Sequence, residues 1–167
     1  PSGGVWEEGV GVWRYAEVAE PTRSAHLVAA LDASYERTRD CPELCGLRDT
    51  RDILASHVAA GEHDPTLWWL VYHEGEPRGC VLLSPQTDAR KAELVYLGLA
   101  PSLRGRGLGR RLLAMGLGEL HRRGIREVSC AVDTRNTAAE RLYERYGMVR
   151  TSVRTPMIRP LARGGAT

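Results

Sequence analysis

The sequence predicts an α/β protein in which helices flank one central mixed, mostly antiparallel sheet. Apolar runs of strand length alternate with stretches of helical periodicity, and glycine or proline stands at most of the boundaries between them. The run 91–99 is apolar on both faces, which is typical of a central strand that is covered on both sides. The predicted order of elements is β-α-α-β-β-β-α-β-α-β.

The first elements have local signals of their own. Residues 10–15 alternate between polar and apolar, which predicts a first strand. Pro21 suits the first turn of a helix, and apolar residues then recur at helical spacing across 27–35. Asp49 or Thr50 is a suitable N-cap for a second helix, which a glycine ends.

Two strands joined by a tight turn follow. Residues 67–72 and 79–83 are rich in apolar residues with a high strand propensity, and glycine and proline stand between them. Trp68 and Trp69 are neighbours on the first of these strands. Because side chains alternate across a strand, we expect one of them in the core and the other exposed near a cleft.

The C-terminal half carries four further elements after strand 91–99. An amphipathic stretch at 108–123 predicts a helix, and 126–132 predicts another strand. The stripe of apolar residues across 136–146 indicates a helix, which a glycine stops. Residues 148–155 are predicted to form a last strand before a tail rich in proline and glycine.

Length and composition predict a single domain over residues 1–167, with tails at about 1–9 and 160–167. The 43% hydrophobic and 26% charged content excludes a mostly disordered chain. No apolar stretch approaches the roughly 20 residues that a bilayer span needs, so we expect no membrane association. The start, Pro-Ser-Gly-Gly, lacks the features of a signal peptide, which predicts a cytoplasmic protein. The absent initiator methionine leaves open a piece cut from a longer chain.

Charge and cysteine content exclude further classes. A net charge of +2 is too small to indicate general nucleic-acid binding. The four cysteines show no second pair at zinc-ligand spacing, so we expect buried free thiols and no metal site.

The run Leu-Arg-Gly-Arg-Gly-Leu-Gly-Arg-Arg at 103–111 lies between the central strand and the following helix. Glycines at alternate positions let the backbone turn sharply and approach a ligand closely. A helix that starts from such a loop presents unpaired N–H groups at the positive end of its dipole, an arrangement that binds phosphate. Four arginines add positive charge around it: Arg104, Arg106, Arg110 and Arg111. The loop therefore predicts a phosphorylated cofactor.

The loop does not match the common nucleotide loops. A Walker loop needs Lys and Ser or Thr after its last glycine, and Arg110 and Arg111 follow Gly109 here. The dinucleotide fingerprint fails because Arg110 stands where its last glycine belongs. Arg/Gly-rich segments that bind RNA are usually disordered, whereas strongly patterned elements frame this one.

The remaining pattern is Arg/Gln-x-x-Gly-x-Gly/Ala, which Arg104, Gly107 and Gly109 satisfy. Here the sequence resembles the GNAT superfamily of acyl-CoA-dependent N-acetyltransferases, in which this loop wraps the pyrophosphate of acetyl-CoA. Residues 136–148 are similar to the family segment N-x-x-A-x-x-L-Y-x-x-x-G-F, with methionine for the final Phe, and 92–101 are similar to the strand before the loop. The resemblance implies the GNAT fold, with acetyl-CoA as cosubstrate.

The resemblance also implies the residues of the donor site. In the family, the strand before the loop is bulged and splays from the next one, and Gly98 marks a bulge or a close approach of the ligand. The N–H of Leu97 would then meet the acetyl carbonyl, and Leu99 would pair with the pantetheine amides. The other implied cofactor contacts are Arg104, Gly105, Arg106, Gly107, Leu108, Gly109, Arg110 and Asn136. Asn136 is equally suited to a helix N-cap.

Tyr143 is the candidate general acid for the departing CoA thiolate. The pKa of a phenol, about 10, and that of a thiol, about 8.5, are close enough for proton transfer in a shared pocket. Tyr143 also lies on an apolar helical stripe, so core packing is the alternative.

Glu93 is the candidate base that takes a proton from the amine. It is expected to share a strand face with Val95, Leu97 and Leu99, where partial burial raises a carboxyl pKa. A strand-end glutamate facing solvent is the alternative.

These observations and the resemblance predict transfer of an acetyl group from acetyl-CoA to a primary amine by direct attack in a ternary complex. The alternative is a non-catalytic acyl-CoA-binding or regulatory domain, including one half of a tandem protein. The acceptor, a small-molecule or peptide amine, is not identified. The loop 37–48, with Asp40 and Glu43, is the expected acceptor side, and a homodimer is left open.

Overall fold

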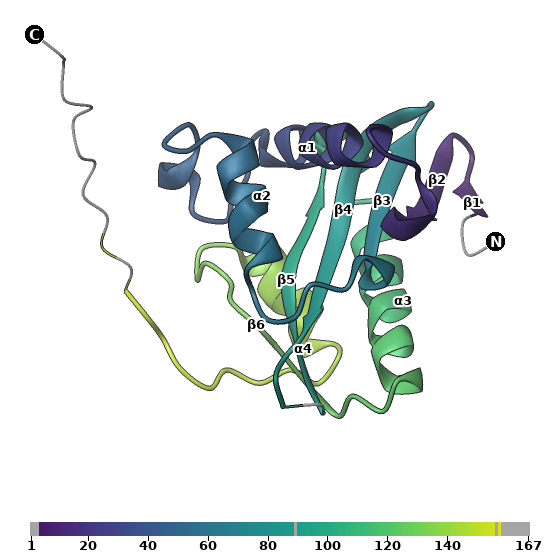
Figure 1. Ribbon diagram of the computed structural model, residues 1–167. Coiled ribbons are helices and arrows are strands. Elements are labelled where there is room, and N and C mark those ends of the chain that lie inside the picture. The colour runs from purple at the N-terminus through teal and green to yellow at the C-terminus, as the bar shows by residue number, and fades with distance from the viewer. Residues whose placement is uncertain (1–3, 89, 156, 158–167) are drawn as a thin grey trace, which may run out of the picture.

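The computed structural model describes residues 4–88, 90–155 and 157, and it contains one six-stranded sheet whose strands follow chain order (Figure 1). All neighbouring strands are antiparallel except β5 and β6, which are parallel. The strands are β1 (Gly4–Glu7), β2 (Val10–Arg14), β3 (Trp68–His73), β4 (Glu76–Pro85), β5 (Lys91–Leu99) and β6 (Glu127–Cys130). The helices are α1 (Thr22–Tyr35), α2 (Thr50–Val58), α3 (Leu108–Arg122) and α4 (Thr137–Glu144). The mixed, mostly antiparallel sheet flanked by helices is confirmed.

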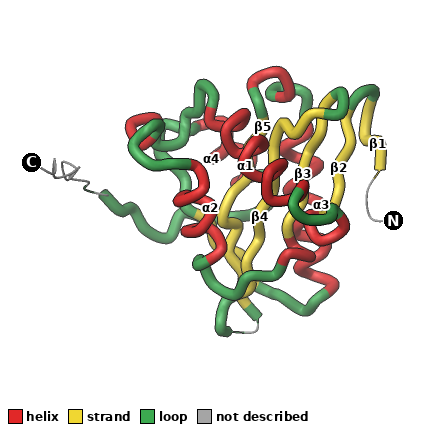
Figure 2. The backbone as a smooth tube through the Cα atoms, turned by 45° about the horizontal axis from the view of Figure 1, so that its top comes forward, coloured by secondary structure: helices red, strands yellow, loops and turns green. Residues whose placement is uncertain are grey.

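Helices cover both faces of the sheet (Figures 1 and 2). Leu27 and Leu31 of α1 pack on one face, together with Trp68. Leu112 of α3 packs on the other face, together with Trp69. Both tryptophans are 1% exposed, so the expectation that one of them reaches the surface is wrong. The alternation along β3 is real, but both of its faces are buried.

The two ends of the chain differ from the predicted order. Residues 4–7 form strand β1 where a tail is expected, and residues 148–155 form no strand where the last one is expected. A strand needs a neighbour, and Val149 and Val153 stand exposed without one in the part of the chain that the structure describes. The observed order is β-β-α-α-β-β-β-α-β-α. The tail expected at 160–167 lies outside the described residues.

Three helices begin after a residue whose side chain or backbone conformation favours the start of a helix. The Asp49 carboxylate accepts a hydrogen bond from the amide of Arg51 at 2.8 Å, so Asp49, not Thr50, caps α2. Asn136 caps α4 by accepting from the amide of Ala139 at 3.3 Å. Gly107 precedes α3 in the left-handed region of the backbone, which glycine adopts without strain.

The buried carboxylate of Glu119 joins α3 to the end of β2. Glu119 is 5% exposed and accepts hydrogen bonds from Arg14 at 2.7 Å, Arg122 at 2.5 Å and Arg123 at 2.8 Å. Arg123 also pairs with Asp64 at 2.7 Å. Burial of this charge is tolerated because three guanidinium groups satisfy it.

The cysteines are free thiols in different environments. Cys80 is buried, Cys41 and Cys130 are half-buried, and Cys45 is exposed, so the expectation of buried thiols is right for Cys80 and wrong for Cys45. None of the helices in the described part of the chain is long and apolar enough to cross a membrane.

Candidate functional site

The strand β5 has a free edge beyond its pairing with β6. The parallel pairing runs from Lys91 to Leu94 and ends there, whereas β5 continues to Leu99. Within the described ranges, no strand pairs with residues 95–99 on this side. We call these residues the free edge of β5.

The backbone amides of Leu97 and Leu99 point out of the sheet ladder at this free edge. The amide of Ala100 donates to the carbonyl of Arg78 on β4 at 2.7 Å, so these two residues form a hydrogen-bonded pair. Hydrogen-bonded pairs alternate with non-hydrogen-bonded ones along an antiparallel ladder. Leu97 and Leu99 occupy non-hydrogen-bonded positions, so their backbone N–H and C=O groups point away from β4. The Leu99 carbonyl agrees with this orientation, because it accepts from Nε of Arg104 at 2.9 Å.

The bulge in β5 lies at Val95 and not at Gly98. Leu82 on β4 faces Tyr96, and the next residue, Leu83, faces Leu94, so Val95 is the extra residue. Gly98 has a different role. A Cβ atom at this position would lie 2.6 Å from Cζ of Tyr96, so glycine leaves room for the tyrosine ring.

Because of the bulge, Glu93 and Leu97 lie on opposite faces of the sheet. Ala92 and Leu94 pack toward α3, and so does Leu97 beyond the bulge. Because side chains alternate, Glu93 lies on the opposite face, toward α1 and α2, and the expectation that it shares a face with Leu97 is wrong. Glu93 is half-buried and accepts a hydrogen bond from the Gln86 amide at 3.4 Å.

The glycine loop leads directly into α3 with its amides exposed. Gly105 and Gly107 have φ angles of 75° and 77°, and a side chain at either position would meet open space. The first hydrogen bond of the helix runs from the amide of Arg111 to the carbonyl of Gly107 at 3.3 Å. The amides of residues 108–110 therefore have no partner within the helix and are available to an anion.

Arg104 fixes the loop and does not face an anion. Its guanidinium donates to the carbonyls of Ser34 at 2.9 Å, Glu36 at 2.8 Å and Arg37 at 2.9 Å, at the C-terminus of α1. Carbonyls at a helix C-terminus lack partners within the helix and carry partial negative charge. Arg104 thereby joins α1, the end of β5 and the start of the loop.

The other arginines of the loop divide into two groups. Arg106 pairs with Glu7 at 2.6 Å, and Arg111 donates to the carbonyl of Trp6 at 3.1 Å and lies over its ring. These two residues hold β1 against the start of α3. Arg110 is exposed and forms an ion pair with no acidic side chain of the described residues, so its charge is free for an anion.

Tyr143 lies on α4, with its ring packed against the core beneath α3. Burial raises the pKa of its hydroxyl, which makes no hydrogen bond within the described part of the molecule. The difference between this pKa and that of a thiol is therefore wider than the sequence suggests. A hydrogen bond to a departing sulfur suits such a hydroxyl better than complete proton transfer does.

A polar network joins two loops near the free edge of β5, the loop between α1 and α2 and the loop between β6 and α4. The amide of Asp133 donates to the Asp40 carboxylate at 2.7 Å, and the amide of Cys41 donates to the Asp133 carboxylate at 3.1 Å. Arg135 binds both carboxylate oxygens of Glu43. The hydrogen bonds from Arg135 lower the pKa of Glu43 to about 2. The acids Asp40 and Glu43 are thus engaged within the protein.

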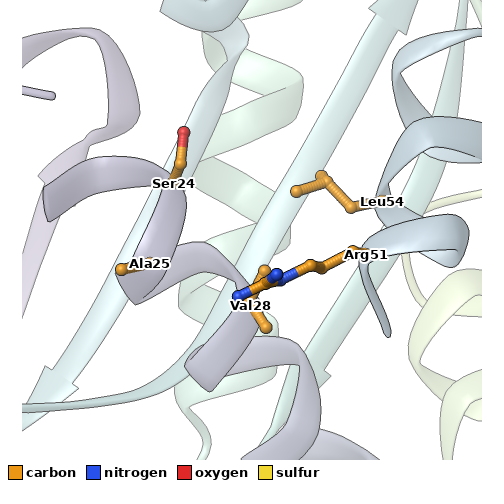
Figure 3. A pocket seen from close by; sticks show the side chains of 5 residues that line it. All are labelled: Ser24, Ala25, Val28, Arg51 and Leu54. Atoms are coloured by element: carbon orange, nitrogen blue, oxygen red, sulfur yellow. The ribbon is translucent and has the colours of Figure 1, made fainter. Parts of the chain in front are cut away.

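A groove of about 460 Å³ runs between α1 and α2 (Figure 3). Its lining combines apolar surface with one hydroxyl and one cation, and the Arg51 side chain extends from α2 toward α1, beside Val28 (Figure 3). A volume in this range accommodates a small molecule. The lining residues are Ser24, Ala25, Val28, Arg51 and Leu54.

Neither this groove nor the environment of His57 has a signal in the sequence. His57 has no metal-ligand spacing in the chain, and its contact with the Tyr96 ring joins residues that are far apart in the sequence. Within the residues that the structure describes, no group of three or more metal-binding side chains is gathered.

Substitution of Gly107 tests the role of the glycine loop in binding CoA. Replacing Gly107 by alanine places a side chain in open space but in the left-handed backbone region, which costs about 1–2 kcal/mol. Without CoA, the loop changes its conformation and avoids this strain. Binding of CoA requires the original conformation, so the strain then weakens the affinity. We expect the dissociation constant for CoA, measured by calorimetry, to rise about 5- to 30-fold.

Gly118→Ala is the matched control, because Gly118 lies within α3 and its Cβ would also meet open space. Alanine there favours the helix, so CoA affinity is expected to stay unchanged while stability rises by up to about 1 kcal/mol. Equal CoA affinities for the two variants would contradict the role of the loop.

Comparison with known proteins identifies the family to which the chain belongs. The family model described as the Acetyltransferase (GNAT) family matches residues 24–148. A mycothiol acetyltransferase from Beutenbergia cavernae is 39% identical over 93 residues, which are 54% of this chain and 31% of the relative. The match thus spans less than a third of that relative's length.

Solved structures share the fold. A GCN5-related N-acetyltransferase from Sphaerobacter thermophilus is 28% identical, covers 89% of this chain and 44% of its own, and has a TM-score of 0.60. A GNAT family acetyltransferase from Elizabethkingia anophelis with acetyl-CoA bound is 17% identical, covers 87% of this chain and 80% of its own, and has a TM-score of 0.58. The family match over residues 24–148 includes the glycine loop, β5 and α4, and the chain belongs to the GNAT acetyltransferase family.

Proposed function

We propose that this domain transfers an acetyl group from acetyl-CoA to a primary amine of a small molecule, by direct attack in a ternary complex. The observation that carries the proposal is the free edge of β5, where the amides of Leu97 and Leu99 point outward beside the open amides of the glycine loop. One linear ligand with amide groups at one end and a pyrophosphate at the other satisfies both groups of donors. CoA has this layout, and the Elizabethkingia relative is described with acetyl-CoA bound.

On the donor side, the roles follow from the contacts of each group. The amides of residues 108–110 and the side chain of Arg110 hold the pyrophosphate, because these donors are not used within the protein. Leu99 pairs with a pantetheine amide. The amide of Leu97 donates to the thioester carbonyl, whose oxygen gains negative charge during attack. Gly105, Arg106 and Asn136 support this site through backbone shape, the contact with β1 and the cap of α4.

The reaction needs a donor for the departing sulfur. The amine attacks the thioester carbon, the C–N bond forms, and the C–S bond breaks. The Tyr143 hydroxyl donates a hydrogen bond to the sulfur as its charge develops. Its raised pKa keeps it protonated at neutral pH, so the donor is always present.

On the acceptor side, Glu93 and the groove between α1 and α2 lie on the same face of the sheet. Glu93 takes the first proton, the one that converts the ammonium group into a free amine. The groove offers one cation and apolar surface, which fits a small molecule with a neutral or anionic body. The relatives named mycothiol acetyltransferase support a mycothiol-related amine as the first acceptor to test.

An acceptor screen tests the proposal. Acetyl-CoA, the protein and each of a panel of primary amines, including mycothiol-related amines, are mixed, and the released CoA thiol is measured. We expect thiol release that depends on one class of amine and yields the acetylated amine by mass spectrometry. CoA binding without transfer to any amine would instead indicate a non-catalytic acyl-CoA-binding domain, one part of a longer protein.

A further inference from the structure

His57 has an enclosed ring nitrogen without a partner. The ring lies on the Tyr96 ring at a centroid distance of 5.6 Å and an angle of 32°. Its Nε2 atom is buried and makes no hydrogen bond within the described residues. The hydroxyl of Tyr96 does not satisfy it, because that hydroxyl is bonded to the Ser34 hydroxyl at 2.8 Å. A buried ring nitrogen without a hydrogen bond costs free energy in a folded protein, so a partner outside the chain is its simplest explanation.

His57 lies on α2 between a residue of the groove and the strand β5. Leu54 lines the groove between α1 and α2, and His57 follows it by one helical turn on the same side of α2. Tyr96, under the His57 ring, directly precedes Leu97, whose amide points out at the free edge of β5. Glu93 lies on the same face of β5. His57 thus lies one helical turn from a residue of the groove and contacts the strand that carries the Leu97 amide.

We propose that Nε2 of His57 accepts the proton that the amine releases when it attacks the thioester. This inference rests on the proposed function and assigns a catalytic residue to it. The free amine carries two protons, and bond formation to carbon makes its nitrogen positive and therefore acidic. One of these protons passes to Nε2 as the C–N bond forms, and the C–S bond breaks with the electron pair leaving on sulfur. The imidazolium then releases its proton to solvent, and the neutral amide remains.

The surroundings keep His57 ready for this step. Burial lowers the pKa of the imidazole, and the charge of Arg48 lowers it further. The titratable groups around it are Arg48, before α2, and Tyr96 on β5, with Tyr35 of α1 edge-on against Tyr96. Burial also raises the pKa of both tyrosines, so neither carries a charge at neutral pH. His57 is thus neutral and has a lone pair available. Glu93 and His57 then divide the two protons between them.

The test compares His57→Gln with His63→Gln. Glutamine keeps a polar group near the position of Nε2 and accepts a hydrogen bond, but it does not take up a proton. His63 is a matched control, because it also packs against an aromatic ring, that of Trp68 at 4.5 Å, and burial also lowers its pKa. Initial rates are measured with the best amine of the screen between pH 5 and 9. Calorimetry with CoA alone shows whether the donor site is intact.

We expect kcat/KM of His57→Gln to fall at least about 30-fold, with the acidic limb of its pH profile flattened and CoA affinity unchanged. His63→Gln is expected to match the wild type in rate and profile. Equal pH profiles and rates within threefold for all three proteins overturn the role of His57 and leave the acetyl transfer standing. If the wild type transfers acetyl to no amine, the proposed function fails first, and the role of His57 fails with it.

A second measurement does not depend on the variant. In the wild type with CoA bound, the Nε2 resonance of His57 in a nitrogen-15 NMR spectrum is expected to shift when the amine is added, while that of His63 stays in place. An unmoved His57 resonance at a saturating amine concentration overturns the inference, even where His57→Gln does not fold.

Discussion

Replacing Tyr143 by phenylalanine is expected to lower kcat for acetyl transfer about 10- to 150-fold while CoA still binds. The ring of Tyr143 is part of the core beneath α3, and phenylalanine keeps that packing. Only the hydroxyl is lost, and it makes no hydrogen bond within the described residues that its removal would break. A hydrogen bond to a charged group contributes about 1.5–3 kcal/mol, which corresponds to this range of rates. Steady-state kinetics and calorimetry with CoA measure the two quantities.

Tyr72→Phe is the matched control for this prediction. Tyr72 is half-buried, and burial raises its pKa as well, but its hydroxyl is bonded to Nδ1 of His26 at 2.9 Å, where α1 meets β3. Its loss is expected to leave kcat within about threefold. If Tyr143→Phe and Tyr72→Phe show the same kcat as the wild type, Tyr143 serves only packing, and water protonates the sulfur.

The local signals of the sequence were sufficient to place the strand and the helix that frame the proposed donor site. Strand β5 and the start of α3 lie where apolar patterning and the glycines of the loop place them, because both depend on neighbouring residues along the chain. Backbone shape at Gly105 and Gly107 is also a local property. The direction of the Leu97 and Leu99 amides follows once the pairing of β4 with β5 is known.

The features that the sequence did not predict all depend on partners distant in the chain. The bulge at Val95 is set by the register against β4, and it moves Glu93 to the other face. Arg104 turns toward the carbonyls of α1 because the fold brings them beside it. The contact of His57 with Tyr96 likewise arises only in the folded chain. Periodicity along one segment contains none of this information.

The same reasoning applies to the chain ends. Residues 148–155 alternate as a strand does, but alternation without a neighbouring strand leaves the backbone unpaired. The short strand β1 shows the reverse case. Its local pattern is weak, yet pairing with β2 and the contacts of Arg106 and Arg111 hold it in the sheet. Pairing partners, more than local propensity, decide which segments near the ends become strands.

The largest effect on stability is expected at Glu119. Glu119→Gln keeps the size of the side chain but removes the charge that three arginines share. Breaking a buried ion pair from one side costs about 3–5 kcal/mol, and the exposure of Arg122 places the loss near the lower end. We expect the free energy of unfolding to fall by about 3 kcal/mol in urea titrations. Glu127→Gln, which loses an exposed pair with Lys91, is expected to change it by less than about 0.5 kcal/mol.

The pH dependence of this difference separates charge from shape. Burial alone raises the pKa of Glu119, but the hydrogen bonds from Arg14, Arg123 and Arg122 outweigh it and lower the pKa to about 2. An unfolded glutamate has a pKa of about 4.3. A folded pKa below the unfolded one stabilises the protein above the unfolded pKa, and this contribution is lost as the pH falls toward the folded pKa.

The difference in the free energy of unfolding between the wild type and Glu119→Gln, the stability gap, is therefore expected to have its full size at pH 6. It should decrease steadily between pH 4.5 and 2. Glu43 also has a pKa lowered to about 2 by Arg135, but its side chain is 62% exposed, so water screens its contribution. Glu43→Gln should accordingly follow the wild type at every pH. A gap for Glu119→Gln that is constant with pH would mean that the arginines are held by the shape of the side chain, and that its charge adds nothing to the fold.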